Sequence, residues 1–236
     1  MDIKEKVVWI TGSSRGIGEA TARALAAAGA RVVISARNMQ DINRIAKNIQ
    51  SDGGSALAIQ CDVQKHADIR TLVDKTRSVW GPIDILINNA GIGIFKKILE
   101  TEQDDWDAMM DTNLKAAFLC TKAVLPEMIE RRQGRIINIV SVAGLQAYPN
   151  GGGYCASKFG LRGFSDVLRL ETREYGIKVT SVCPGATSTD IWGDADVDHS
   201  VMIRPQEVAT AIVSVCQAGD SAHIEELVLR PQGGDL

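Results

Sequence analysis

The sequence is short of several kinds of residue, and each shortage excludes a class of protein. Its 236 residues hold 26 Lys and Arg against 29 Asp and Glu, a net charge of −3, with no block of basic residues. Without a concentrated basic face, neither nucleic acid nor an anionic membrane is expected as the main partner. No stretch approaches the roughly 20 apolar residues of a membrane span, so no spanning helix is expected.

Cysteine and histidine are also scarce. The five cysteines are an odd number and include no Cys-x-x-Cys pair, which favours reduced thiols over a disulfide framework. The three histidines lie apart from any cluster with ligand spacing, so no metal site is expected. Residues 1–6 are charged and lack the apolar core of a signal peptide, and together these features predict a cytoplasmic protein.

What the sequence does contain is a regular alternation of short apolar runs and helical patterns. Such alternation predicts a single α/β domain over residues 1–236, a doubly wound Rossmann fold with a seven-stranded parallel sheet. The apolar runs are typical of strands buried on both faces. The predicted strands are 6–11, 31–36, 56–61, 83–88, 134–141, 177–183 and 225–230, and the predicted helices are 17–28, 41–52, 66–80, 101–132, 154–175 and 205–218.

A glycine-rich loop joins the first predicted strand to the first helix. Residues 11–18 read Thr-Gly-Ser-Ser-Arg-Gly-Ile-Gly. Such a loop lets the backbone approach a pyrophosphate, and the helix that follows offers unpaired N–H groups to it. The strand and helix on either side favour a dinucleotide site over a plain tight turn. The predicted cofactor contacts in this loop are Gly12, Ser14, Arg15, Gly16, Ile17 and Gly18.

The end of the second predicted strand indicates which dinucleotide is bound. An NAD-selective site would carry an acidic residue there to accept the ribose hydroxyls, but residues 34–38 contain none. Arg37 stands in its place, and Arg15 lies inside the glycine loop. Two guanidinium groups at these positions could flank a 2′-phosphate with charge-assisted hydrogen bonds. The sequence therefore predicts NADP(H).

Further candidates follow later strands. Asp62, with Val63, ends the third strand, where its carboxylate could meet an adenine amino group or cap the next helix. Residues 89–91, Asn89-Ala90-Gly91, form a small-residue turn that suits either a ligand or tight packing. The polar, poorly periodic segment at about 187–204 is expected to be a short substrate flap.

Tyr154 and Lys158 are the chemical centre of the sequence. On a helix they lie one turn apart on one face, where an ammonium favours the phenolate and lets the pair exchange a proton with an alcohol or ketone. Ser141, at the end of the fifth strand, could hold a carbonyl oxygen or serve as a turn residue. Asn113 lies on an apolar side of its helix, either as a satisfied core amide or as part of a solvent relay.

These motifs, in this order and spacing, resemble those of the short-chain dehydrogenase/reductase family over essentially the whole chain. The resemblance implies that Tyr154 is the general acid/base, that Lys158 lowers its pKa and binds the nicotinamide ribose, that Ser141 orients the substrate oxygen, and that Asn113 holds a relay water. It also implies a homodimer or homotetramer built by helices around 104–132 and 154–176. The further cofactor contacts that it implies are Pro184, Gly185, Thr187 and Thr189.

The leading hypothesis is an NADPH-dependent carbonyl reductase acting on a small molecule. The segment 190–193 and the C-terminal residues resemble those of sepiapterin-reductase-like bacterial members, so a pterin ketone is one alternative substrate. A 3-oxoacyl-carrier-protein substrate is another, and it requires a basic docking surface near the mouth of the pocket. A non-catalytic NADP-sensing protein is a third alternative. The basic candidates for docking are Arg131, Arg132, Arg162 and Arg169.

Overall fold

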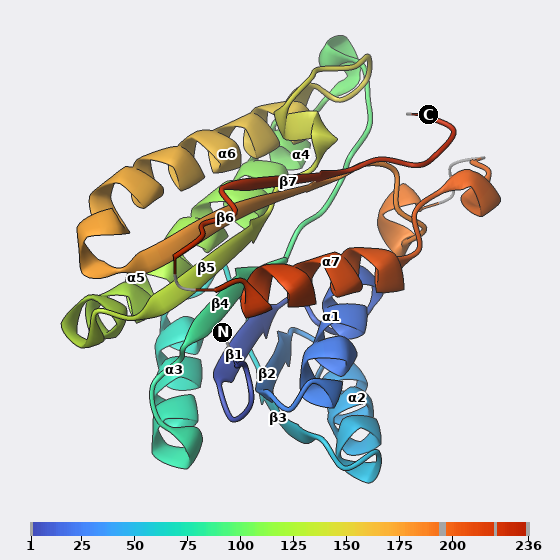
Figure 1. Cartoon of the computed structure of the whole chain (residues 1–236). Coiled ribbons are helices and arrows are strands. Elements are labelled where there is room, and N and C mark those ends of the chain that lie inside the picture. The colour runs from blue at the N-terminus through green and yellow to red at the C-terminus, as the bar shows by residue number, and fades with distance from the viewer. Residues whose placement is uncertain (1, 194–196, 220, 235–236) are drawn as a thin grey trace.

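A computed structural model describes residues 2–193, 197–219 and 221–234. Within these ranges the chain forms one seven-stranded parallel sheet in the order β3-β2-β1-β4-β5-β6-β7 (Figure 1), which confirms the predicted fold. The strands are β1 (Val7–Thr11), β2 (Arg31–Ala36), β3 (Ser55–Gln60), β4 (Ile85–Asn88), β5 (Gly134–Ile139), β6 (Ile177–Pro184) and β7 (Glu226–Leu229). The α-helices are α1 (Gly16–Ala27), α2 (Met39–Ser51), α3 (His66–Trp80), α4 (Gln103–Met110), α5 (Ala116–Arg131), α6 (Gly152–Thr172) and α7 (Pro205–Gln217).

Helices cover both faces of the sheet (Figure 1). Because side chains alternate along a strand, Val8 and Ile10 of β1 join the core under α1, α2 and α7. Val7 and Trp9 join the core under α3, α5 and α6. Both faces of the central strand are therefore apolar, which explains the continuous apolar run in the sequence.

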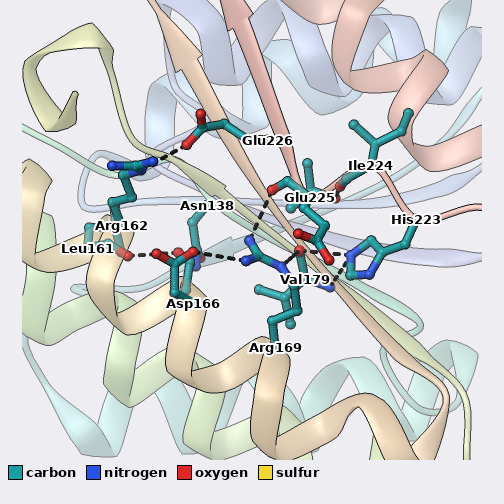
Figure 2. A network of polar contacts seen from close by, with 12 residues as sticks. Asn138, Leu161, Arg162, Asp166, Arg169, Val179, His223, Ile224, Glu225 and Glu226 are labelled. Atoms are coloured by element: carbon teal, nitrogen blue, oxygen red, sulfur yellow. Dashed lines mark hydrogen bonds and ion pairs between the residues drawn. The ribbon is translucent and has the colours of Figure 1, made fainter.

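Arginines of α6 hold the edge strand β7 in place through hydrogen bonds and an ion pair (Figure 2). Arg169 donates from Nε to the Val179 carbonyl of β6 at 3.1 Å and from Nη2 to the Glu225 carbonyl at 3.0 Å. Arg162 Nε lies 2.8 Å from Glu226 Oε2. These contacts fix the C-terminal strand beside β6 and give both guanidinium groups polar partners within the chain.

The strand order reverses between β1 and β4, which are neighbours in the sheet although two strands separate them in the chain. At such a switch point the loops after the two strands turn to opposite sides and leave a crevice at the carboxyl edge of the sheet. The glycine loop follows β1, and the turn at 89–91 follows β4. The topology thus brings these two predicted ligand loops together.

The long helix predicted at 101–132 is interrupted. Between α4 and α5 the chain makes a π-helical turn at Asp111–Lys115, and Asn113 lies in it. Such turns insert one residue into a helix and often occur at functional sites. The other predicted boundaries shift by a few residues at most; β4, for example, begins at Ile85 rather than at residue 83. None of the helices in the described part of the chain is long and apolar enough to cross a membrane.

Candidate active site

A cleft of about 1060 Å³ runs along the carboxyl edge of the sheet at the switch point. It is lined by the loops that follow the first six strands. Of the predicted site residues, Gly18 and Asn113 do not line it. Those that do are Gly12, Ser14, Arg15, Gly16, Ile17, Arg37, Asp62, Val63, Asn89, Ala90, Gly91, Ser141, Tyr154, Lys158, Pro184, Gly185, Thr187 and Thr189.

The glycine loop packs tightly against the turn after β4. Gly12 has φ +60°, and a Cβ there would lie 2.7 Å from Ala90 Cα, so only glycine fits. Thr11 Oγ1 accepts hydrogen bonds from the N–H groups of Asn89 and Ala90, both at 2.9 Å. The Asn89 amide donates to the carbonyls of Thr11 and Gly12. These hydrogen bonds therefore fix the conformations of the two loops relative to each other.

This packing also explains the position of Gly18. A Cβ there would lie 2.6 Å from Asn89 Nδ2 and 2.6 Å from the Gly12 carbonyl oxygen. Gly18, predicted as a cofactor contact, therefore lies under the loop and allows the helix to approach it. Asn89 does line the cleft, but its amide is already bonded within the loop.

The nucleotide end of the cleft offers donors for an anion. Helix α1 begins at Gly16 with no side-chain cap, so N–H groups of its first turn have no side-chain partner. Among the described residues, the exposed Arg37 guanidinium has no ion-pair or hydrogen-bond partner, whereas Arg15 Nη1 lies 3.1 Å from Asp190 Oδ2. These groups fit a nucleotide with an additional phosphate.

The structure excludes one of the two roles considered for Asp62, which were an adenine contact and capping of the next helix. The N-cap of α3 is Lys65, so Asp62 does not cap that helix. Its Oδ1 instead accepts from the Gln64 N–H at 3.1 Å within the turn. Asp62 and Val63 both line the cleft, which leaves the adenine contact as the prediction for Asp62.

Tyr154 and Lys158 lie on the first two turns of α6, buried beneath the cleft. Lys158 Nζ donates to the Ile139 carbonyl at 2.8 Å and lies 5.6 Å from the centre of the Tyr154 ring. Burial lowers the pKa of Lys158 to about 8, because an ammonium loses its hydration there. The predicted pairing on one helix face is confirmed in geometry.

The direction of the tyrosine pKa differs from the expectation. Burial raises the pKa of Tyr154 to about 12, while its hydrogen bond with Ser141 acts in the opposite direction. The tyrosine is therefore protonated near neutral pH, in the form that donates to a carbonyl oxygen. The implied lowering of its pKa by Lys158 stays a prediction.

Ser141 holds an unusual backbone conformation at the end of β5. Its φ of 143° lies in a region that favours glycine. Its Oγ accepts from the Ala143 N–H at 3.1 Å and bonds with Tyr154. Ser141 therefore caps the turn that follows β5 and also contacts the tyrosine, and its role in holding a carbonyl oxygen stays a prediction.

Asn113 lies behind the cleft, fully paired with protein groups. Its Oδ1 accepts from the Ile92 N–H at 2.8 Å, and its Nδ2 donates to the Ile92 carbonyl and to Ser157 Oγ. The side chain therefore clamps the loop after β4 to the π-helical turn and to α6. This supports the reading as a satisfied amide, and the relay role stays a prediction.

The four arginines considered for docking a carrier protein are used elsewhere, and none of them lines the cleft. Arg131 pairs with Asp84 at 2.9 Å, and Arg132 donates to the Glu174 carbonyl. Arg162 and Arg169 hold β6 and β7, as described above. None of these contacts tests the docking of a carrier protein outside the cleft, so a basic docking surface formed by these residues stays a prediction.

The predicted flap is anchored at both ends. The Ile203 N–H donates to the Ala186 carbonyl, and the Ser188 N–H donates to the Ile203 carbonyl, both at 2.9 Å. Residues 194–196 of the flap lie outside the described residues. Its role in binding substrate stays a prediction.

Three aromatic residues of the cleft were missed. Phe95, Tyr148 and Trp192 line the cleft beside Tyr154. Aromatic residues make up only 5% of the sequence, and their presence in predicted loops was the available signal, because a loop that exposes a large ring commonly uses it for binding.

Comparison with known proteins gives consistent matches over most of the chain. A model described as short chain dehydrogenase matches residues 6–199. Sepiapterin reductase of Chlorobaculum tepidum is 34% identical over 238 residues, which cover 98% of each chain. A 3-oxoacyl-[acyl-carrier-protein] reductase of Synechocystis is 36% identical over 237 residues, which cover 97% of this chain and 96% of the relative.

Two solved structures also match this chain over nearly its whole length. A metagenomic short-chain oxidoreductase in complex with NADP superposes with a TM-score of 0.87 at 33% identity, covering 98% of this chain and 99% of the other. A variant of actinorhodin polyketide ketoreductase with NADPH gives a TM-score of 0.90 at 31% identity, covering 98% of both chains.

Proposed function

The chain belongs to the short-chain dehydrogenase family, and we propose that it transfers hydride between NADP(H) and a carbonyl or secondary alcohol of a small molecule. The observation that carries the proposal is the meeting of Ser141, Tyr154 and Lys158 in one cleft with the glycine loop. A protein that only senses the cofactor would have no use for a buried ammonium beside a buried phenol.

NADP is the cofactor, as in the solved relatives that hold NADP or NADPH. The N-terminus of α1 and the backbone of the glycine loop would hold the pyrophosphate. Arg37 would bind the 2′-phosphate together with Arg15, which exchanges its partner Asp190 for the phosphate. The other residues proposed to hold the cofactor are Asp62, Val63, Asn89, Ala90, Gly91, Tyr154, Lys158, Pro184, Gly185, Thr187 and Thr189.

The cofactor, when bound, supplies the hydride. Ser141 positions the carbonyl oxygen by a hydrogen bond, and the protonated Tyr154 donates its proton to that oxygen. The phenolate that remains is costly in a buried site, and the ammonium of Lys158, 5.6 Å from the ring centre, stabilises it. In alcohol oxidation the same groups act in reverse, and Tyr154 accepts the proton.

The cleft favours one of the substrate classes considered for this protein. A 3-oxoacyl carrier protein needs basic groups at the mouth of the cleft, whereas none of the four candidate arginines lines the cleft and each has a polar partner within the chain. We therefore favour a free small-molecule carbonyl over a carrier-bound thioester. A pterin ketone remains within that class, consistent with the similarity to sepiapterin reductase.

Self-association and a cytoplasmic location are part of the same proposal. Phe159 and Leu170 of α6 are 43% and 66% exposed, and a second copy covering this helix would bury them. This supports a homodimer or homotetramer. The five cysteines are buried and unpaired, as suits a reducing compartment. Light scattering would test the assembly, and a purely monomeric protein would refute it.

The function is tested by following NADPH and NADH oxidation by the purified protein with a panel of carbonyl compounds. The panel contains aliphatic diketones, ring ketones, a pterin ketone and a 3-oxoacyl thioester. We expect reduction of small-molecule carbonyls with a strong preference for NADPH. Failure to reduce any member, in the presence of tight NADPH binding, would favour the cofactor-sensing alternative.

A further inference from the structure

Three aromatic rings gather beside the catalytic tyrosine. Phe95 meets the Tyr154 ring edge to face, with 5.4 Å between centroids and 66° between planes. On other sides Phe95 stacks with Trp192, at 5.9 Å and 20°, and contacts Tyr148 at 6.5 Å. We call Phe95, Tyr148 and Trp192 the aromatic wall. All three residues line the cleft, so they bound the space next to the reacting oxygen.

Two of these rings occupy space that is free only because a glycine lies next to them. A Cβ at Gly93 would lie 2.8 Å from Phe95 Cζ, and a Cβ at Gly151 would lie 2.6 Å from Tyr148 Cε2. Neither distance is tolerated by a real side chain, so each glycine leaves room for the ring beside it. A bridge between Lys96 and Gly151 also joins the two loops that carry Phe95 and Tyr148.

The third ring is held by a hydrogen bond. Trp192 Nε1 donates to the Thr187 carbonyl at 2.8 Å, which fixes the indole relative to the end of β6. The wall is therefore assembled from three separate segments, each with its own restraint. A preorganised surface binds a complementary shape without the entropic cost of ordering its side chains.

The wall lies in an uncharged part of the cleft. Apart from Lys158, the charged side chains that line the cleft come from the nucleotide end and from Asp190, which pairs with Arg15. Around the wall the lining is neutral, with Gln146, Pro149 and Asn150. A ligand with a charged group there would be desolvated without an ionic partner.

From the fixed rings and the neutral lining, we propose that the aromatic wall selects carbonyl compounds that carry a flat, uncharged aromatic or heteroaromatic ring within one carbon of the reacting carbonyl. The inference rests on the proposed reductase function and specifies its substrate class. Such a ring packs against Phe95 and Trp192 while its carbonyl points to Tyr154 and Ser141. Each aromatic contact is expected to favour a flat ring over a saturated one by about threefold to tenfold in affinity.

The test compares two substrates that differ only in the ring. These are 1-phenylbutane-2,3-dione and 1-cyclohexylbutane-2,3-dione, in which one carbon separates the ring from the diketone, so that the ring does not conjugate with it. With saturating NADPH we expect kcat/KM to be at least about tenfold higher for the phenyl compound, mainly through a lower KM. Butane-2,3-dione reports carbonyl reduction without a ring.

The variants Phe95→Leu and Trp192→Leu remove one ring each and retain apolar bulk. Each is expected to lower the phenyl to cyclohexyl ratio by about threefold to tenfold. Tyr148→Leu tests the third ring, with Tyr175→Leu as its matched control. Tyr175 precedes β6 at the opposite edge of the sheet and contacts Arg132, so this control should leave the ratio unchanged.

The outcomes separate the two proposals. Reduction of butane-2,3-dione with equal kcat/KM for both ring compounds overturns the aromatic inference and leaves the reductase function standing. A ratio that favours phenyl but does not fall in Phe95→Leu and Trp192→Leu also overturns it, because another part of the cleft would then select the ring. Absence of any carbonyl reduction overturns the reductase function, and the inference with it.

Discussion

The buried ammonium of Lys158 permits a stability measurement that needs no substrate. Lys158 is 4% exposed, and burial lowers its pKa from 10.5 to about 8. Since each factor of ten in a proton equilibrium corresponds to about 1.4 kcal/mol, keeping this group protonated in the fold costs about 3 kcal/mol. Lys158→Met removes the charge and keeps an unbranched, apolar side chain in the same space.

The expected gain in the free energy of unfolding is smaller than the full cost of burying the Lys158 ammonium. The substitution also removes the hydrogen bond from Nζ to the Ile139 carbonyl, which is worth about 1 kcal/mol. We therefore expect Lys158→Met to raise the free energy of unfolding by about 2 kcal/mol near neutral pH. The same variant should lose carbonyl reduction, because the phenolate of Tyr154 would have no cation beside it.

The pH dependence gives the sharper test. Below about pH 8, Lys158 binds a proton in both the folded and unfolded states, so its cost is present in full. Between that pH and the unfolded value of 10.5, the unfolded state binds more protons, so the stability of the wild type rises relative to the variant. Above that window the advantage of the variant is gone.

Urea unfolding of both proteins, at a series of pH values across this window, measures the difference at each pH. Titration of the remaining groups is common to both proteins and cancels in that difference. A difference that stays constant across the window would refute the claim that Lys158 is an ammonium buried at a cost. If Lys158→Met were less stable than the wild type at neutral pH, the expected gain in the free energy of unfolding would be refuted.

Three further predictions concern other parts of the cleft. Arg37→Asp should lower the ratio of kcat/KM for NADPH over NADH by at least about tenfold, because a 2′-phosphate would meet a carboxylate. Gly12→Ala should lower the free energy of unfolding by about 1–3 kcal/mol in urea, since its Cβ would collide with Ala90 at a positive φ. Ser141→Ala should lower kcat about 100-fold with an unchanged Kd for NADPH, because the carbonyl oxygen and Tyr154 lose a shared partner. An unaltered cofactor ratio, wild-type stability or wild-type kcat would contradict these predictions in turn.

The sequence predicted the parts of the site that depend on local spacing. A glycine loop needs its strand and helix as neighbours in the chain, and Tyr154 and Lys158 need only one helical turn between them. The sheet followed from the alternation of apolar runs and helical patterns, and β1 is buried on both faces as its composition indicated. Such features can be predicted because the residues that determine them are adjacent in sequence.

Features that depend on distant contacts were not predictable. The π-helical turn at Asp111–Lys115 inserts one residue into a helical pattern that remains periodic on both sides. The raised pKa of Tyr154 arises from burial, which depends on which loops cover α6. The aromatic wall joins Phe95, Tyr148 and Trp192 from three loops, and no spacing in the sequence relates them.

The central claim is that Tyr154 supplies the proton in a reduction that uses NADPH. Tyr154→Phe keeps the ring that packs against Phe95 and removes only the hydroxyl. The direct measurement is the rate of NADPH oxidation with an accepted carbonyl, made together with the Kd for NADPH on the same preparation. The account predicts a loss of kcat of at least about 1000-fold with Kd unchanged within about twofold. Turnover near the wild-type rate, with intact cofactor binding, would contradict it.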